Sequence, residues 1–415
     1  MPATPMEVDL DRARALRVLG RGAMGTVFLV DSDPSRPGCG GCYALKVFDK
    51  RSVGPTKRDA DRRARWEVTL LSRLAHPHLP SLLGTAETPD LLAWAIPYCP
   101  GGDLNELRYS LPDRVFSPAA IRFYIAETVS ALADLHASGV VYRDLKPENV
   151  LLRADGHVTL TDFDLSRLLP TSSTSPPPQQ QPPVFHCRAK REPAVSVSVP
   201  AASTPKQQLQ NLVRFLMRSN GAALELAKKV KSARVSPVSR KFSASFGAAW
   251  GKSYSFVGTE EYVAPEVVRG DGHGFDVDWW ALGVLVYEMA FGRTPFKGKN
   301  RKETFRNVLH REIEFPGDTQ WRMPELTDLI SRLLERDPAR RLGYAGGADE
   351  IRAHPFFAGM AWDLLAELSR PPYIPPPAED AAAGEGFDVR DYFKKLHQPP
   401  PPNSDTSSSD FSSEF

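Results

Sequence analysis

Apolar and polar residues alternate from residue 16 to residue 30, a pattern that predicts two β-strands joined by a glycine-rich turn. Short apolar runs at 43–48, near 82–85 and at 91–96 predict three further strands. Between the first two of these runs, residues 57–74 place leucines on one helical face and predict a helix. The first hundred residues are therefore expected to form a β-rich unit with one main helix.

The later part of the chain has the periodicity of helices. Ser117-Pro118 is a typical helix start, and the helix is expected to run to His136 and to end at Ser138-Gly139. Residues 276–291 are apolar on nearly every face, as in a helix that passes through the centre of a lobe. Further helices are expected near 301–310, 325–335 and 348–353.

A hairpin is predicted between these two parts, with strands near 150–152 and 158–160 and the turn dipeptide Asp155-Gly156. The residues around it that carry chemistry are Asp144, Lys146, Asn149 and Asp162. Two carboxylates, an amide and an ammonium group suit a site that coordinates Mg²⁺ and orients a hydroxyl against a phosphate, because a hard cation takes oxygen ligands. The alternative interpretation is an acidic surface hairpin.

The glycine-rich turn has the spacing G-x-G-x-x-G-x-V at Gly20, Gly22 and Gly25. Where side chains are absent, the backbone can approach phosphate oxygens and direct its N–H groups at them. Dinucleotide-binding folds share this spacing, but their glycine turn opens a helix. Here the β-forming residues 26–30 follow, which favours a strand–turn–strand phosphate loop.

Composition is that of a soluble globular protein, with 41% hydrophobic and 25% charged residues. Four cysteines are too few for a disulfide framework, and no apolar run approaches the roughly 18 residues that span a bilayer. These features predict a soluble protein of a reducing compartment, or one bound only peripherally to membrane.

Charge is unevenly distributed, because residues 170–252 hold thirteen Lys and Arg against two Glu. This segment therefore carries +11 and the rest of the chain −9. Within it, residues 207–217 have the spacing of a basic amphipathic helix, which can lie on an anionic membrane or bind a partner groove. The alternative is a transient helix in a disordered insert. Cys187–Arg191 is a short basic cluster of the kind found in nuclear-import signals.

Taken together, these motifs resemble the serine/threonine protein kinases of the AGC group. The resemblance is carried by Tyr142-Arg-Asp, Val257-Gly-Thr, Tyr287-Glu-Met-Ala, Arg370-Pro-Pro-Tyr-Ile-Pro and a terminal phenylalanine pair, Phe411 and Phe415. Asp162-Phe-Asp164 in place of Asp-Phe-Gly, with a long insert after it, is similar to the plant-specific branch that contains phototropins, PINOID and UNICORN. The glycine-loop sequence is most similar to its UNICORN/WAG end.

The resemblance implies an α+β, bilobal protein-kinase fold with a small β-rich N-lobe and a large helical C-lobe. Its implied divisions are a lead-in at 1–15, an N-lobe at about 16–98, a C-lobe at about 99–357, a basic insert at 170–250 and a C-terminal tail at 358–415. The tail motif has one residue more between its aromatics than is usual in the family. Its docking on the N-lobe, and recruitment of an upstream phosphoinositide-dependent kinase, therefore stay open.

The implied site is one for ATP and Mg²⁺. Asp144 would accept the proton of the substrate hydroxyl, Lys146 would neutralise the transferred phosphoryl group, and Asn149 and Asp162 would hold the metal. Lys46, in an apolar strand where an unpaired charge is costly, would bind phosphates and pair with Glu67. The other residues implied for ATP are Leu19, Gly20, Gly22, Gly25, Val27, Ala44, Ile96, Pro97 and Cys99.

The resemblance also implies which residues recognise the substrate and which residue is phosphorylated on activation. Asp103, Glu148 and Glu288 match acidic positions that read arginines before the acceptor, so basophilic substrates are expected. Ser255 matches the activation-loop phosphosite, with Arg143 as the phosphate's partner and Ser253 as the alternative site. Two further implied features are a structural ion pair of Glu266 with Arg341 and a positive φ at Asp164, where most kinases have Gly.

Two other classes of function compete with an active kinase. A pseudokinase scaffold usually lacks the lysine, base or metal ligand, and all of these are present here. An adaptor that binds anionic lipid through the basic insert is the second; sequence-specific nucleic-acid binding is not expected, because no recognition motif is present. A monomeric protein of plant growth signalling is expected, in the cytoplasm and nucleus and peripherally at the plasma membrane.

Overall fold

The computed structural model describes residues 6–22, 24–31, 41–51, 57–169, 252–316, 323–368, 371–375 and 386–397. The insert at 170–250, with its expected amphipathic helix, and the motif Phe411–Phe415 lie outside these residues. None of the described helices has the length and apolarity needed to cross a bilayer.

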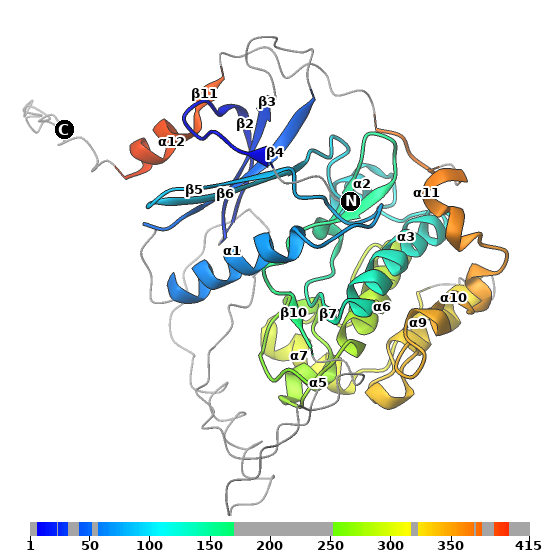
Figure 1. Cartoon of the computed structure of the whole chain (residues 1–415). Helices are drawn as coiled ribbons and strands as arrows, with labels where there is room; N and C mark the ends of the chain where they lie inside the picture. The colour runs from blue at the N-terminus through cyan, green and yellow to red at the C-terminus, as the bar shows by residue number, and fades with distance from the viewer. Residues whose placement is uncertain are drawn as a thin grey trace, which may run out of the picture. The chain divides into compact units, whose positions relative to one another are not determined.

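The chain divides into two compact units (Figure 1). Unit 1 comprises residues 1–75, 80–100 and 376–415, and unit 2 comprises 76–79 and 101–375. The segment 76–79 belongs to unit 2 because both the backbone and the side chain of His78 are hydrogen-bonded to strand β9 (Val158–Leu160). Its carbonyl accepts from the Leu160 N–H at 3.1 Å, and its Nδ1 lies 2.9 Å from the Val158 carbonyl.

Unit 1 contains a seven-stranded sheet with the order β1-β5-β6-β4-β3-β2-β11. All neighbouring strands are antiparallel except β1 and β5, which are parallel. The strands are β1 (Met6–Glu7), β2 (Arg14–Gly22), β3 (Gly25–Asp31), β4 (Cys42–Asp49), β5 (Gly84–Glu87), β6 (Leu91–Pro97) and β11 (Phe387–Asp388).

The predicted glycine turn joins β2 to β3. Gly25 has φ +125°, and a Cβ there would lie 2.1 Å from the Val47 carbonyl oxygen of the neighbouring strand β4. Both conformation and space therefore require glycine at this position.

The two faces of the sheet are covered by different helices. Helix α1 (Lys57–Leu71) lies on the face that carries Lys46, to which it is bonded through Glu67. Helix α12 (Val389–Leu396) buries Val389 and Phe393 against the opposite face, with Leu45 and Val47 of β4. Alternation along β4 thus sends its charged side chain to one helix and its apolar side chains to the other.

The segment taken as a lead-in, 1–15, contributes to this unit. Strand β1 pairs with β5, and Val8 and Leu10 are buried in the same apolar cluster as Phe28. No strand is predictable here from the sequence, because the segment is short and gains its apolar contacts only from strands that lie farther along the chain.

Unit 2 is mainly helical. The helices among its described residues are α2 (Leu104–Ser110), α3 (Pro118–Ala137), α5 (Pro265–Arg269), α6 (Asp276–Phe291), α7 (Arg301–His310), α9 (Pro324–Leu333), α10 (Ala348–Arg352) and α11 (Leu365–Leu368). Its strand pairs are β7 (Val140–Val141) with β10 (Arg167–Leu168), and β8 (Val150–Leu152) with β9. Short 3₁₀ turns at Pro147–Asn149 and Glu260–Tyr262 stand beside the candidate site.

The predicted central helix is confirmed as α6. It buries nearly every side chain, including Trp279 and Trp280, and it packs against α3 and α9. Helix α3 begins where the sequence predicts, with the Ser117 hydroxyl accepting a hydrogen bond from the Ala120 N–H at 3.3 Å.

Some predicted boundaries differ by two or three residues. Helix α1 ends at Leu71 and not at residue 74, because the Arg73 N–H bonds to the Leu70 carbonyl and tightens the last turn. Strand β5 begins at Gly84 and not at residue 82. The tail elements β11 and α12 were not predicted from the sequence.

Candidate active site

One buried carboxylate, that of Asp278 in α6, anchors the loop that carries Asp144. It accepts hydrogen bonds from the backbone N–H groups of Tyr142 at 2.8 Å and Arg143 at 2.7 Å. Arg143 has φ +69°, the left-handed region that a side chain disfavours. The central helix thus fixes an otherwise unfavourable backbone directly before Asp144. The role of Asp278 was not predicted, although a carboxylate inside a nearly apolar helix is a signal that could have indicated it.

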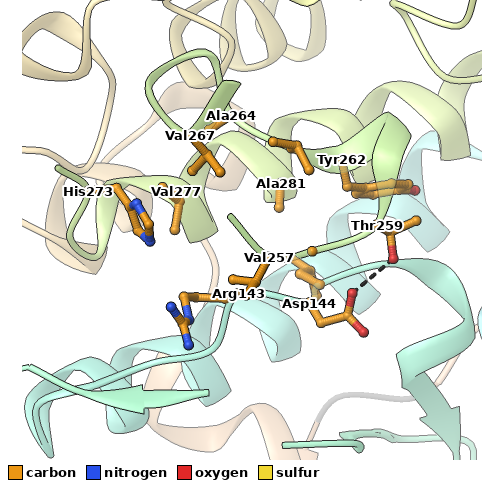
Figure 2. A pocket seen from close by; sticks show the side chains of 13 residues that line it. Arg143, Asp144, Val257, Thr259, Tyr262, Ala264, Val267, His273, Val277 and Ala281 are labelled. Atoms are coloured by element: carbon orange, nitrogen blue, oxygen red, sulfur yellow. Dashed lines mark hydrogen bonds between the residues drawn. The ribbon is translucent and has the colours of Figure 1, made fainter. Parts of the chain in front are cut away.

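Asp144, Lys146, Asn149 and Thr259 form a buried hydrogen-bond network. The Thr259 hydroxyl donates to Asp144 Oδ1 at 2.9 Å, as Figure 2 shows, and Lys146 Nζ donates to Asp144 Oδ2 at 3.1 Å. Lys146 also lies 3.1 Å from Thr259 Oγ1, and Asn149 Nδ2 donates to Asp144 Oδ2 at 3.0 Å. Asp144, Lys146 and Asn149, which were predicted from one short stretch of sequence, are therefore joined by Thr259 from the segment that follows the insert.

Asp162 is placed beside this network by the predicted hairpin, which the structure has with the expected strands and with Gly156 at φ +84°. The Thr161 N–H donates to the Asn149 carbonyl at 3.0 Å, so Asp162 follows directly on a residue bonded to the loop. Asp162 itself adopts φ +62°. Asp144, Asn149 and Asp162 therefore belong to one local constellation within unit 2.

The positive φ expected at Asp164 is wrong. Among the described non-glycine residues it occurs at Arg114, Arg143 and Asp162. Asp164 is the second residue of a turn closed by a hydrogen bond from the Ser166 N–H to the Phe163 carbonyl at 3.0 Å. The first central residue of the common turn types takes a negative φ, so this position accepts a residue other than glycine.

The donor groups at Asn149 and Asp162 fit a hard divalent cation. The Asn149 amide nitrogen is used by Asp144, donating to its carbonyl oxygen at 2.7 Å as well as to its carboxylate. Both bonds use the amide nitrogen, and the amide oxygen is the atom of this side chain that can coordinate a cation. One amide oxygen and one carboxylate match the oxygen donors that Mg²⁺ takes when phosphates and water complete its shell. Among the described residues no cluster of three or more His, Cys, Asp or Glu could hold a metal by itself.

In unit 1, the predicted ion pair of Lys46 with Glu67 is present. Lys46 Nζ lies 2.7 and 2.9 Å from the two carboxylate oxygens, both residues are buried, and the ammonium sits 5.3 Å from the Trp94 ring centroid. Burial without these partners would be costly. The lysine is thereby held in an extended, defined position.

Several other residues predicted for ATP lie on the Lys46 face of the sheet. Val27 stands opposite Lys46 in the β3–β4 ladder, and Ala44 stands opposite Ile96 in the β4–β6 ladder. Of the remainder, Leu19, Gly20 and Gly22 lie on β2, Gly25 on β3 and Pro97 on β6, and Cys99 follows β6. At Gly20 and Gly22 a Cβ would meet nothing within 4 Å, so the chain's own packing does not require glycine there.

A family model for the protein kinase domain matches residues 13–182 and 240–357. The chain belongs to the protein kinase family. It is 48% identical over 405 residues to serine/threonine-protein kinase UCNL of Arabidopsis thaliana, across 96% of this chain and 92% of that protein. Identity to serine/threonine-protein kinase UCN of the same plant is 47%, across 97% and 94% of the two chains. Protein kinase PINOID of rice is 41% identical, across 89% of this chain and 70% of its own length.

These relationships identify the chain as a serine/threonine kinase of the plant AGC branch with a bilobal, α+β kinase fold. They agree with the motifs from which that branch was expected. The gap in the family match, 183–239, falls inside the basic insert.

The two candidate phosphosites of this kinase share one arginine but differ in exposure. Arg143 Nη1 donates to Ser255 Oγ at 2.6 Å and to Ser253 Oγ at 3.0 Å, and Arg167 adds a contact to Ser253 at 3.3 Å. Ser253 is 1% exposed and its backbone is paired on both sides with His273. Ser255 is half-buried, so it is the more accessible hydroxyl.

The three predicted substrate-reading acids are neighbours in unit 2. Burial above all, with the charges of Glu106 and Glu148, raises the pKa of Asp103 to about 6. Burial also raises the pKa of Glu288, and Glu148 adds to this effect. Asp103 additionally caps α2, because its side chain accepts a hydrogen bond from the Glu106 N–H at 2.8 Å.

The predicted structural ion pair is present as well. Arg341 Nη1 and Nη2 lie 2.7 and 3.0 Å from the two oxygens of Glu266, and both side chains are buried. Arg341 also approaches the Asp276 carboxylate at 3.7 Å. This pair stands outside the Asp144 network.

Proposed function

We propose that this kinase transfers the γ-phosphate of Mg²⁺-bound ATP to serine and threonine hydroxyls in basic protein segments, with Asp144 as its catalytic carboxylate. The observation that carries the proposal is the buried network of Asp144, Lys146, Asn149 and Thr259, which holds a carboxylate and an ammonium group in fixed geometry. Positioning and preorganised charge supply most of the rate in phosphoryl transfer.

Each residue of the network has a separate task in this proposal. Asp144 orients the acceptor hydroxyl and takes its proton as the oxygen bonds to phosphorus. Lys146 neutralises charge on the transferred group. Asn149 and Asp162 hold Mg²⁺, which when bound screens the phosphate charges. In unit 1, Lys46, fixed by Glu67, binds the phosphates of ATP, and the open surface at Gly20 and Gly22 lets the backbone approach them.

A single substitution with a matched control tests the assignment. Asp144→Asn removes the proton acceptor and keeps the size of the side chain, so we expect phosphorylation of a basic protein substrate to fall by about 10³-fold or more. Asp155→Asn, the same change at the exposed hairpin turn, should leave the rate unchanged. Equal activity of Asp144→Asn and wild type would exclude Asp144 as the base, and chelation of divalent cations without loss of activity would exclude the metal.

The substrate preference is proposed from acidic side chains of unit 2, with Asp103 and Glu148 among them. Carboxylates gathered in one place raise one another's pKa, and a substrate guanidinium would relieve this repulsion. A peptide array in which arginines before the acceptor made no difference to the rate would refute the preference.

Activation is proposed to follow phosphorylation of Ser255. A phosphate there would replace the neutral contact with Arg143 by a charge-assisted one and would order the segment that carries Thr259. We expect Ser255→Ala to lower activity of phosphorylated enzyme to that of the dephosphorylated form. Ser253→Ala, at the buried hydroxyl, tests the alternative site. If Ser253→Ala lost phosphate incorporation and Ser255→Ala retained it, the phosphosite would be reassigned to Ser253.

The charge of the insert supports a second, compatible role. The net charge of +11 over residues 170–252 favours binding to anionic lipid, and thereby peripheral attachment to the plasma membrane of a kinase otherwise in cytoplasm and nucleus. Recruitment of an upstream phosphoinositide-dependent kinase is proposed separately, through the tail motif Phe411–Phe415. Co-sedimentation of the full chain with phosphatidylserine vesicles, compared with a chain lacking 170–250, tests the lipid role; equal binding would remove it.

A further inference from the structure

Glu288, one of the three carboxylates expected from the sequence to read substrate arginines, is already paired within the chain. Arg108 Nη2 lies 3.2 Å from Glu288 Oε1, and the Tyr262 hydroxyl donates a hydrogen bond to Oε2. Glu288 is 9% exposed, so both of its oxygens are engaged in a largely dry environment. A substrate arginine that reached Glu288 would have to compete with Arg108.

Arg108 is firmly held in this position. It is 5% exposed, its Nη1 donates to the Gly292 carbonyl at 2.9 Å, and its Nη2 donates to Asn105 Oδ1 at 2.8 Å. Its guanidinium carbon also lies 4.6 Å from the centroid of the Tyr109 ring. An arginine fixed by several contacts loses little further entropy in the ion pair, whereas a substrate arginine must be ordered on binding.

Asp103 and Glu148 differ from Glu288 in this respect. Both are only partly buried, and in the described part of the chain no Lys or Arg lies within ion-pair distance of either carboxylate. Burial above all, and then the charges of Glu106 and Glu148, raise the pKa of Asp103, and no internal cation within ion-pair distance offsets this effect. An external guanidinium gains most where such repulsion is uncompensated.

We propose that Arg108 is a specificity-determining residue, which occupies Glu288 from within and so restricts arginine recognition to Asp103 and Glu148. The inference rests on the proposed basophilic activity and refines it. Substrates with one arginine before the acceptor would then be accepted nearly as well as substrates with two, because the second subsite is already filled.

The test uses the purified full chain and acceptor peptides with a single serine. In each peptide, one arginine at positions two to five before the serine is replaced by alanine, and kcat/KM is compared between the arginine and alanine forms. We expect Arg108→Leu to raise this ratio by about tenfold at one position, because the uncovered carboxylate gains a charge-assisted partner. Arg114→Leu is the matched control, since Arg114 stacks on the same Tyr109 ring at 4.9 Å without contacting Glu288.

A second variant removes the carboxylate itself. Glu288→Gln should change the ratio by less than about twofold in the wild-type background and should abolish the gain in the Arg108→Leu background. A tenfold loss on Glu288→Gln alone would overturn the inference, as would an unchanged ratio in folded Arg108→Leu. If Arg108→Leu does not fold, the ratio measured for Glu288→Gln alone decides between the two outcomes: a change of less than about twofold supports the inference, and a tenfold loss overturns it. Wild type as inactive as Asp144→Asn on every peptide would instead refute the proposed function.

Discussion

The two units of this kinase assemble their cores from very different distances along the chain. The centre of unit 2 is one helix of 16 residues, α6, packed against α3 and α9. Unit 1 completes its sheet with strands from both ends of the chain, and a hydrogen bond from Arg14 to the Gly386 carbonyl joins residues 372 positions apart.

The units also differ in what they bury. Unit 1 covers one face of its sheet with an apolar and aromatic cluster around Phe28, Val389 and Phe393. Unit 1 also buries the ion pair of Lys46 with Glu67, but unit 2 buries a larger set of charged and titratable groups, including Glu266, His273 and Arg341. Stability of unit 1 should therefore depend on aromatic packing supplied by the tail, and stability of unit 2 on electrostatic partners and pH.

Loss of the buried guanidinium of Arg341 should have the largest effect on stability. Arg341→Met leaves the carboxylates of Glu266 and Asp276 without the guanidinium between them, and we expect the free energy of unfolding of unit 2 to fall by about 3–5 kcal/mol. Denaturant unfolding followed by circular dichroism measures this. The control is Arg340→Met at the adjacent, exposed arginine, which should cost less than about 1 kcal/mol. Equal effects of the two would show that the buried pair is not important for stability.

Truncation of the tail aromatic comes next. Phe393→Ala removes a ring that is 5% exposed and lies edge-on to Phe28 at 5.9 Å, so unit 1 should lose about 3–4 kcal/mol. Leu396→Ala, on the same helix but 59% exposed, should change stability by less than about 0.5 kcal/mol. Hydrogen exchange resolves which unit is affected; faster exchange confined to unit 2 would contradict the packing of α12 on the sheet.

Lowering the pH should destabilise unit 2 by a smaller amount, through protonation of His273. Burial, with the nearby charge of Arg143, lowers the pKa of His273 from 6.5 to about 4, and neither ring nitrogen has a hydrogen-bond partner among the described residues. The unfolded chain therefore binds the proton more readily, so this stability is complete above about pH 6.5 and is lost as pH falls towards 4. The loss should reach about 2 kcal/mol at pH 5.

His273→Phe isolates this effect, because it removes the titration without breaking a hydrogen bond to the described part of the chain. We expect unit 2 of this variant to unfold at nearly the same temperature at pH 7 and to lose less stability than wild type between pH 7 and 5. The measurement is thermal unfolding across that range. The same pH dependence in both proteins would show that other groups, such as His78 with its pKa of about 4, account for it.

The catalytic residues were predictable because they are close in sequence. Asp144, Lys146 and Asn149 fall within six positions, and a hairpin with an Asp-Gly turn leads to Asp162, so local geometry alone brings them together. Thr259 and Asp278 come from beyond the insert, and their contacts with the loop depend on the packing of unit 2. The sequence indicated their residue types but not these bonds.

The pattern of apolar residues by itself determined strands β2 to β6, β8 and β9 and the central helix, because these follow from local periodicity and turn chemistry. The sequence also contained the motif spacing that belongs to a protein kinase. Only the tertiary structure decided that the N-terminal segment and α12 complete unit 1, that Asp162 and not Asp164 takes the positive φ, and that Arg108 occupies Glu288. The first and third of these depend on contacts between segments distant in sequence, and local propensity carries no information about which distant side chain will satisfy a buried charge or an open apolar face.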